Sequence, residues 1–87
     1  MSVKTKDEIL LRVTDLLRDV LMQPALQVTA QSTTDQIAGW DSLTHMTIIS
    51  RIEQDFGVEF QFQEIIALEK VGDIIERISE KLGLDAA

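Results

Sequence analysis

The chain has 87 residues, enough for one domain with a modest core and too few for an enzyme with a cleft between two domains. Cysteine is absent and His45 is the single histidine, which excludes disulfides, thiolate metal sites and multi-histidine metal sites. The net charge of −7 argues against nucleic-acid binding, no apolar run approaches the length of a membrane span, and no signal-peptide pattern is visible, so we expect a soluble, cytoplasmic protein.

The first predicted element is a helix over about residues 5–22. Thr5 and Glu8 have the spacing of a capping box. Apolar residues then recur every three or four positions and define one helix face: Ile9, Val13, Leu16, Leu17, Val20 and Leu21. Pro24 is expected to end this helix.

Residues 23–40 show no sustained period and are rich in Gln, Ser and Thr. A connection of this length is unusual in a small domain. Four apolar residues are expected to anchor it to the core: Leu26, Val28, Ile37 and Trp40. Gly39 supplies backbone freedom just before the next element.

A second helix is predicted over about residues 42–56, with Asp41 as its N-cap and Gly57 as its stop. Its apolar face comprises Leu43, Met46, Ile49, Ile52 and Phe56. The alternating Val58, Phe60 and Phe62 resemble a strand that would have no partner, so we predict an extended loop.

One or two helical turns are predicted between Gln63 and Leu68. The last helix is predicted over about residues 70–82 and carries the cleanest apolar stripe: Val71, Ile74, Ile75, Ile78 and Leu82. Gly83 follows it as a stop, and residues 85–87 are expected to fray.

Together these elements predict an all-α fold, a small four-helix bundle of three longer helices and a short third one, with a long first connection. We expect one domain over residues 1–87 with an ordered part at about 5–83. No helix has an additional apolar face that would need to be buried against a second copy of the chain, so a monomer is expected.

The acidic excess lies in the middle of the chain. Between Asp19 and Glu69 there are eight acidic residues, and Arg51 is the only basic one. Such a segment attracts partners with basic patches and raises their association rate. Alternatively, it is simply a solubilising surface.

Ser42 is the candidate for chemistry. As the first helical residue after the Asp41 cap, it should point outward beside backbone N–H groups that lack partners within the helix. A phosphate ester on its hydroxyl would face the positive end of the helix dipole. The simpler alternative is a serine that only begins a helix.

A resemblance extends this reading. Gly39-Trp40-Asp41-Ser42-Leu43, the later segment from Asp55 to Phe60, and Lys70-Val71-Gly72-Asp73-Ile74-Ile75 are similar to three segments of the acyl carrier protein family. The tripeptide Asp-Ser-Leu alone is a weak signal, but length, acidity and helix order agree over roughly residues 5–83.

The resemblance implies that Ser42 carries 4′-phosphopantetheine, transferred from coenzyme A by a magnesium-dependent phosphopantetheinyl transferase of the holo-acyl-carrier-protein synthase type. The protein would be a carrier with no catalytic residues and no metal site of its own. Asp41 would aid recognition by the transferase. The partners would be acyl-transferring or acyl-modifying enzymes that carry basic patches. Seven apolar residues would contact these enzymes or the acyl chain: Leu43, Met46, Ile49, Phe60, Ile65, Ile66 and Leu68. Ile65 and Ile66 are adjacent, so both cannot point inward.

The sequence also departs from the family. Thr44 and Thr47 occupy positions that are often acidic in fatty-acid carriers, and Arg51 adds a positive charge, which favours a specialised carrier over a housekeeping one. Lys70 stands where the family often has a threonine cap, so the last helix is expected to begin loosely. Trp40 replaces a small residue and is expected to anchor the loop.

Three alternatives remain at this point. An aminoacyl carrier of the D-alanyl type would share these features, and an unmodified acidic helical interaction module would not need Ser42. A catalytic Asp41–Ser42–His45 set is disfavoured because three residues in one helical turn cannot readily form the serial hydrogen bonds of a triad. His45 is expected to lie near the phosphate or in solvent.

Overall fold

Three longer helices and one short helix make up the part of the computed structural model that is described, residues 5–84. The α-helices are α1 (Lys6–Val20), α2 (Ser42–Phe56), α3 (Phe62–Ile66) and α4 (Val71–Leu82), and a 3-10 turn, η1 (Thr34–Gln36), lies in the first connection. The predicted all-α class and the order of four helices are therefore confirmed. The predicted frayed tail at 85–87 lies outside the described residues.

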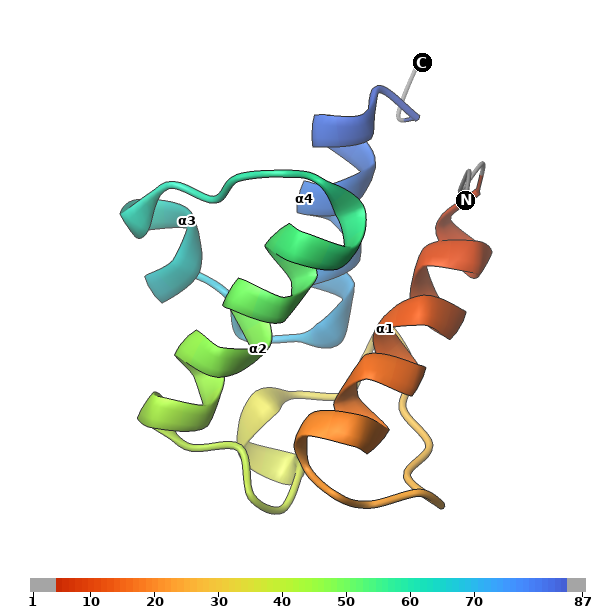
Figure 1. Ribbon diagram of the computed structural model, residues 1–87, viewed down its shortest axis with the longest axis vertical. Coiled ribbons are helices and arrows are strands. Elements are labelled where there is room, and N and C mark those ends of the chain that lie inside the picture. Colours follow the sequence, from red (N-terminus) through yellow and green to blue (C-terminus); the bar gives the residue numbers. More distant parts are fainter. Residues whose placement is uncertain (1–4, 85–87) are drawn as a thin grey trace.

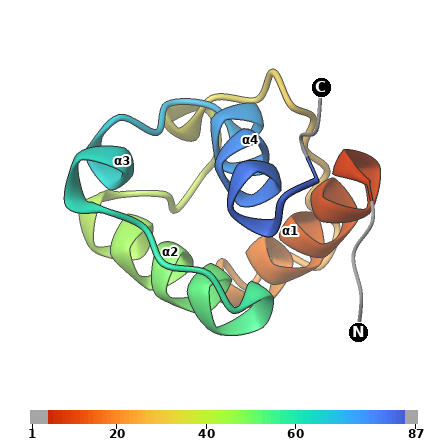
Figure 2. The ribbon, with the colours of Figure 1, turned by 90° about the horizontal axis from the view of Figure 1, so that it is seen from above.

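The helices α1, α2 and α4 surround the core, and α3 lies at the edge beside α2 (Figure 2). In Figure 1, α1 descends while α2 and α4 both ascend, so α1 is antiparallel to the other two. The beginning of α2 therefore lies at the opposite end of the molecule from the beginning of α1. The first connection crosses this end of the molecule and brings Asp41 to the start of α2.

The core is almost entirely aliphatic. Residues with no exposed surface come from α1, α2 and α4: Ile9, Val13, Leu17, Ile48, Ile52, Val71, Ile74 and Ile78. Towards α3 the core is completed by Val58, Phe60, Ile65 and Leu68, each at most 9% exposed. Residues 58–61 form an extended segment without strand pairing, as predicted, but Phe62, predicted to belong to this segment, begins α3.

Most helix ends follow the predicted capping chemistry. The Thr5 side chain accepts from the Glu8 N–H at 3.2 Å, and Gly57 and Gly83 end α2 and α4 in the left-handed conformation. The prediction that Pro24 ends the first helix is wrong, because α1 already stops at Val20. Met22 adopts a φ of 56°, and the Gln23 N–H closes the helix end on the Arg18 carbonyl at 2.9 Å.

The first connection also fixes the start of α4. The N–H groups of Val71 and Gly72 donate to the carbonyls of Ser32 and Ala30 at 2.9 and 2.8 Å. Asp73 accepts from the Lys70 N–H at 3.1 Å. The expected loose start at Lys70 is therefore wrong, since backbone carbonyls from the loop replace the missing side-chain cap.

Gly72 is required by this contact. A Cβ atom at Gly72 would lie 2.7 Å from the Ala30 carbonyl oxygen, closer than side-chain carbons approach backbone atoms. The glycine thus allows the loop to lie directly on the first turn of α4.

Candidate functional site

Ser42 is exposed at the first position of α2, as predicted. Asp41 is extended and its Oδ1 accepts from the Thr44 N–H at 2.8 Å, which makes it the N-cap. This N–H holds the pKa of the Asp41 carboxyl below its ordinary value of 3.8, so the group is charged at neutral pH. The Ser42 hydroxyl therefore lies beside the positive end of a capped helix.

An open pocket of about 560 Å³ lies beside Ser42. One side is formed by α2 and the opposite side by α3, and the first connection closes the end between them. The lining residues are Thr34, Asp35, Trp40, Asp41, Ser42, His45, Met46, Ile65, Ile66 and Leu68. The pocket thus combines apolar walls with a polar end at the serine.

The structure separates the predicted apolar contact residues into three groups. Met46, Ile65, Ile66 and Leu68 line the pocket beside Ser42. Leu43 is 78% exposed and lines a second groove along the outer face of α2. Ile49 and Phe60 are 1% and 9% exposed and belong to the core, so the structure does not bring them to the pocket.

The two adjacent isoleucines on α3 point in different directions. Ile65 is 8% exposed and packs into the core, whereas Ile66 is 66% exposed. Both border the pocket. Only one faces inward, as the sequence required.

His45 connects the first connection to α3. Its Nδ1 lies 2.9 Å from the Trp40 Nε1, which can only donate, so Nδ1 is the acceptor. The other ring nitrogen, Nε2, lies 2.9 Å from the Ile65 carbonyl oxygen and must donate to it. The alternative that His45 lies in solvent is therefore wrong, because the ring is half-buried between two partners, and it lines the same pocket as Ser42.

This arrangement is also unsuitable for a catalytic triad. Both nitrogens of His45 are engaged, so neither is available to accept a proton from Ser42. The sequence analysis did not predict this contact because Trp40 precedes the start of α2 whereas His45 lies within the helix. The available signal was that a half-buried indole N–H needs an acceptor.

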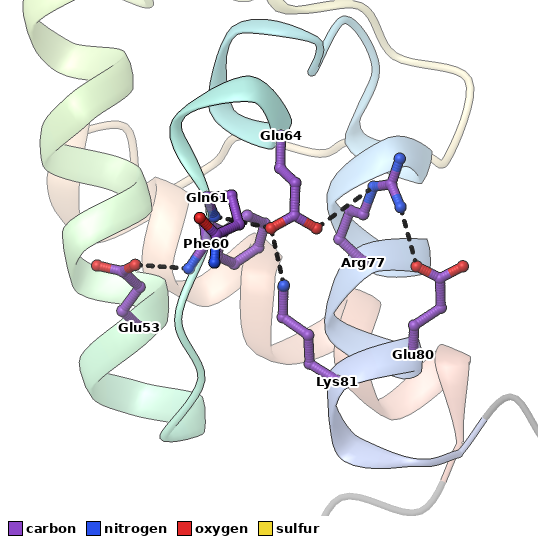
Figure 3. Close-up of polar contacts among 7 residues, drawn as sticks. All are labelled: Glu53, Phe60, Gln61, Glu64, Arg77, Glu80 and Lys81. Carbon is purple, nitrogen blue, oxygen red and sulfur yellow. Dashed lines mark hydrogen bonds and ion pairs between the residues drawn. The ribbon is translucent and has the colours of Figure 1, made fainter.

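Glu64 connects α3 to α4 (Figure 3). Its Oε1 accepts from the Gln61 N–H at 2.7 Å and from the Lys81 ammonium at 2.9 Å, and Arg77 lies 3.9 Å from Oε2. The Gln61 N–H and then Lys81 hold the pKa of Glu64 below its ordinary value of 4.5. On the other side, Glu53 of α2 accepts from the Phe60 N–H at 2.8 Å.

Ion pairs offset part of the acidic charge in the middle of the chain. Arg51 pairs with Asp19 at 2.9 Å and with Asp55 at 3.8 Å, so it bridges α1 and α2 as well as adding positive charge. Within residues 5–84, no group of three or more His, Asp or Glu side chains is placed to hold a metal ion. None of the helices described is long and apolar enough to cross a membrane.

Comparison with known sequences shows the family. A family model described as "Phosphopantetheine attachment site" matches residues 11–86. An acyl carrier protein of Thermotoga maritima is 29% identical over 79 residues, covering 91% of this chain and 98% of the relative. One from Petrotoga mobilis is 28% identical over 81 residues, covering 93% and 95%.

Solved structures give the same fold. The solution structure of a holo acyl carrier protein from Geobacter metallireducens superposes with a TM-score of 0.79 at 28% identity, covering 93% of this chain and 88% of the other. A crystal structure of an acyl carrier protein from Thermotoga maritima has a TM-score of 0.80 at 19% identity, covering 90% and 91%, and so supports the fold alone.

Proposed function

The chain belongs to the phosphopantetheine attachment-site family of acyl carrier proteins, and from this premise we propose that Ser42 bears 4′-phosphopantetheine and that the protein carries acyl intermediates between enzymes. The observation that supports the site is the exposed Ser42 hydroxyl at the capped start of α2, beside the pocket. In this proposal the protein is a carrier without catalytic residues and works as a cytoplasmic monomer.

The residues around Ser42 fit a phosphodiester. The hydroxyl is reachable by a transferase, and the helix dipole stabilises negative charge at this point. The adjoining pocket offers apolar walls from Met46 and Ile66 along which an extended arm could lie. When attached, the arm supplies a terminal thiol that holds the acyl group as a thioester.

Asp41 has two roles in this proposal. Its cap to the Thr44 N–H fixes the turn that presents Ser42. Its second role, recognition by the transferase, follows from its charged carboxylate beside the hydroxyl. An Asp41→Asn variant separates the two, because an amide oxygen still accepts from Thr44 while the charge is lost.

The surface next to Ser42 supports a specialised carrier. Leu43 and Met46 are 78% and 47% exposed, and Thr47 beside them is uncharged. Along the first two turns of α2, partner enzymes would therefore meet an apolar, uncharged surface, with Asp41 as the charged group next to the serine and acidic side chains within the helix only from Glu53 onward. A housekeeping enzyme that relies on basic residues to grip this end would have little to pair with.

The attachment is tested by intact mass after incubation with coenzyme A, magnesium and a broad-specificity phosphopantetheinyl transferase. We expect the wild type to gain one phosphopantetheine and Ser42→Ala to gain none. Ser50→Ala, which changes another exposed serine of the same helix, is the matched control and should be modified normally. Modification of Ser42→Ala, or none in a folded wild type even with the transferase of its own host, would refute the proposal.

The specialised role is tested by adding the missing acids. We expect the modified wild type to be loaded poorly by a housekeeping malonyl transferase, and Thr44→Glu/Thr47→Glu to be loaded faster. A double change to glutamine controls for size. Efficient loading of the wild type would favour a housekeeping carrier instead.

A further inference from the structure

The helix α3 has little packing of its own to hold it beside the pocket. It has five residues, of which Phe62 and Ile66 are 69% and 66% exposed. A helix this short does not form by itself, so contacts with the rest of the chain must fix it. On the side of the Ser42 pocket, the polar contact that reaches α3 is the hydrogen bond from His45 to the Ile65 carbonyl.

The same imidazole also contacts the first connection, which closes the end of the pocket. Trp40 donates to Nδ1 while Nε2 donates to Ile65, which requires the neutral ring with its proton on Nε2. One side chain therefore spans from the first connection to α3, and both of its partners line the pocket.

We propose that neutral His45 is a positioning residue that sets the shape of the pocket beside Ser42 by joining Trp40 to α3, and that its protonation releases Trp40. A protonated ring carries N–H groups on both nitrogens, so Nδ1 and the indole N–H would oppose each other across 2.9 Å. The bond to Ile65 survives this change, and the contact with Trp40 does not.

The pH range in which protonation of His45 is tested depends on the charged groups near its ring. Asp35 of η1 and Asp41 before α2 border the same pocket. Glu64 of α3 faces Lys81 on α4 instead. Because the pKa of Asp41 is lowered, this carboxylate stays charged between pH 8 and pH 5, the range in which histidine changes charge.

Trp40 makes the first measurement specific, because it is the only tryptophan and the chain has no tyrosine. In the unmodified wild-type protein we expect its fluorescence to show one transition between pH 8 and pH 5. His45→Gln retains a neutral donor and acceptor and should show none. The same transition in His45→Gln, or a flat wild-type profile, would overturn the proposal.

Hydrogen exchange at pH 8 provides the second measurement. We expect the protection factors of the α3 amides to fall about five-fold in His45→Leu, the loss of one hydrogen bond, and to recover at least in part in His45→Gln. Ser50→Ala on the same helix is the control. Wild-type protection in a folded His45→Leu would contradict the positioning role, and if His45→Leu does not fold, the pH response of His45→Gln still decides.

The consequence for the prosthetic arm rests on the proposed function and is measured separately. In the modified protein we expect the arm thiol of His45→Leu to react several-fold faster with a small disulfide reagent than that of the wild type. Equal rates would refute the effect of His45 on the arm. Failure of Ser42 to accept the arm would be distinct, because the fluorescence and exchange measurements use unmodified protein.

Discussion

The core formed by α1, α2 and α4 and the short helix α3 are held by different forces. The three longer helices bury side chains such as Ile52 and Ile78 with no exposed surface. In α3 only Ile65 is buried, and polar contacts supply the remaining links, from His45 on one side and from Lys81 on the other. Apolar burial stabilises the frame, whereas a few hydrogen bonds and ion pairs set the position of α3.

The difference matters because α3 forms one wall of the pocket beside Ser42. A segment with little buried apolar surface opens at lower free energy than the core around it. The frame can therefore stay folded while α3 shifts. Substitutions in the two regions should differ accordingly, with large losses of stability in the core and small losses with local consequences in α3.

Two isoleucines test this contrast most strongly. Ile78→Ala removes a side chain with no exposed surface from α4 and should lower the free energy of unfolding by about 2–5 kcal/mol. Ile66→Ala makes the same chemical change on α3, where the side chain is 66% exposed, and should change it by no more than about 0.5 kcal/mol. Urea denaturation measures both, and similar losses would show that α3 is part of the core.

Gly72→Ala tests the close contact of the loop with α4. The new Cβ would meet the Ala30 carbonyl at 2.7 Å, so we expect a loss of about 1–3 kcal/mol. Without that contact, alanine would stabilise the helix by up to about 1 kcal/mol, so the sign of the change is diagnostic. Gly83→Asn, where nothing lies within 4 Å and asparagine tolerates the left-handed conformation, is the control. A more stable Gly72→Ala would refute the contact.

Ser79 is an exception within the core. Its side chain has no exposed surface, and its hydroxyl has no hydrogen-bond partner among the described residues. Ser79→Ala removes this unsatisfied group and should raise the free energy of unfolding by about 1 kcal/mol. Ser50→Ala, an exposed change on α2, should lie within about 0.5 kcal/mol of the wild type. A destabilised Ser79→Ala would mean that the hydroxyl is satisfied.

The helical frame could be predicted from the sequence because its signals are local. The stripe from Val71 to Leu82 and the Asp41 and Gly57 boundaries of α2 all appear in the structure as predicted. The exposed position of Ser42 follows from the same cap. Each of these features depends on residues within a few positions of one another, where periodicity and capping rules apply.

The long-range contacts that join the elements could not be predicted in this way. The bond from His45 to the Ile65 carbonyl spans 20 residues, and the one from Gly72 to Ala30 spans more than twice that. Both use backbone carbonyls, which every residue has, so no residue type marks them in the sequence. Likewise, the early end of α1 depends on Met22 adopting a positive φ, which methionine rarely does.

Glu64 links α3 to α4 through its ion pairs. Glu64→Gln loses the ion pairs to Lys81 and Arg77 and should lower the free energy of unfolding by about 1 kcal/mol at neutral pH. Because the folded-state pKa of Glu64 is below 4.5, this stabilisation is complete above pH 4.5 and disappears as the pH falls through the folded-state value. The stabilities of the wild type and Glu64→Gln should therefore differ at neutral pH and converge in acid.

Glu59→Gln, which removes the same charge from an exposed position outside α3, is the control for net charge and should not reproduce the convergence. In hydrogen exchange, Glu64→Gln should lower the protection of the α3 amides and leave the protection of the Ile52 and Ile78 amides unchanged. If the core amides lose protection as much as those of α3, then α3 unfolds only together with the frame. In that case a polar contact on α3 stabilises the whole domain, and α3 does not open independently of the core.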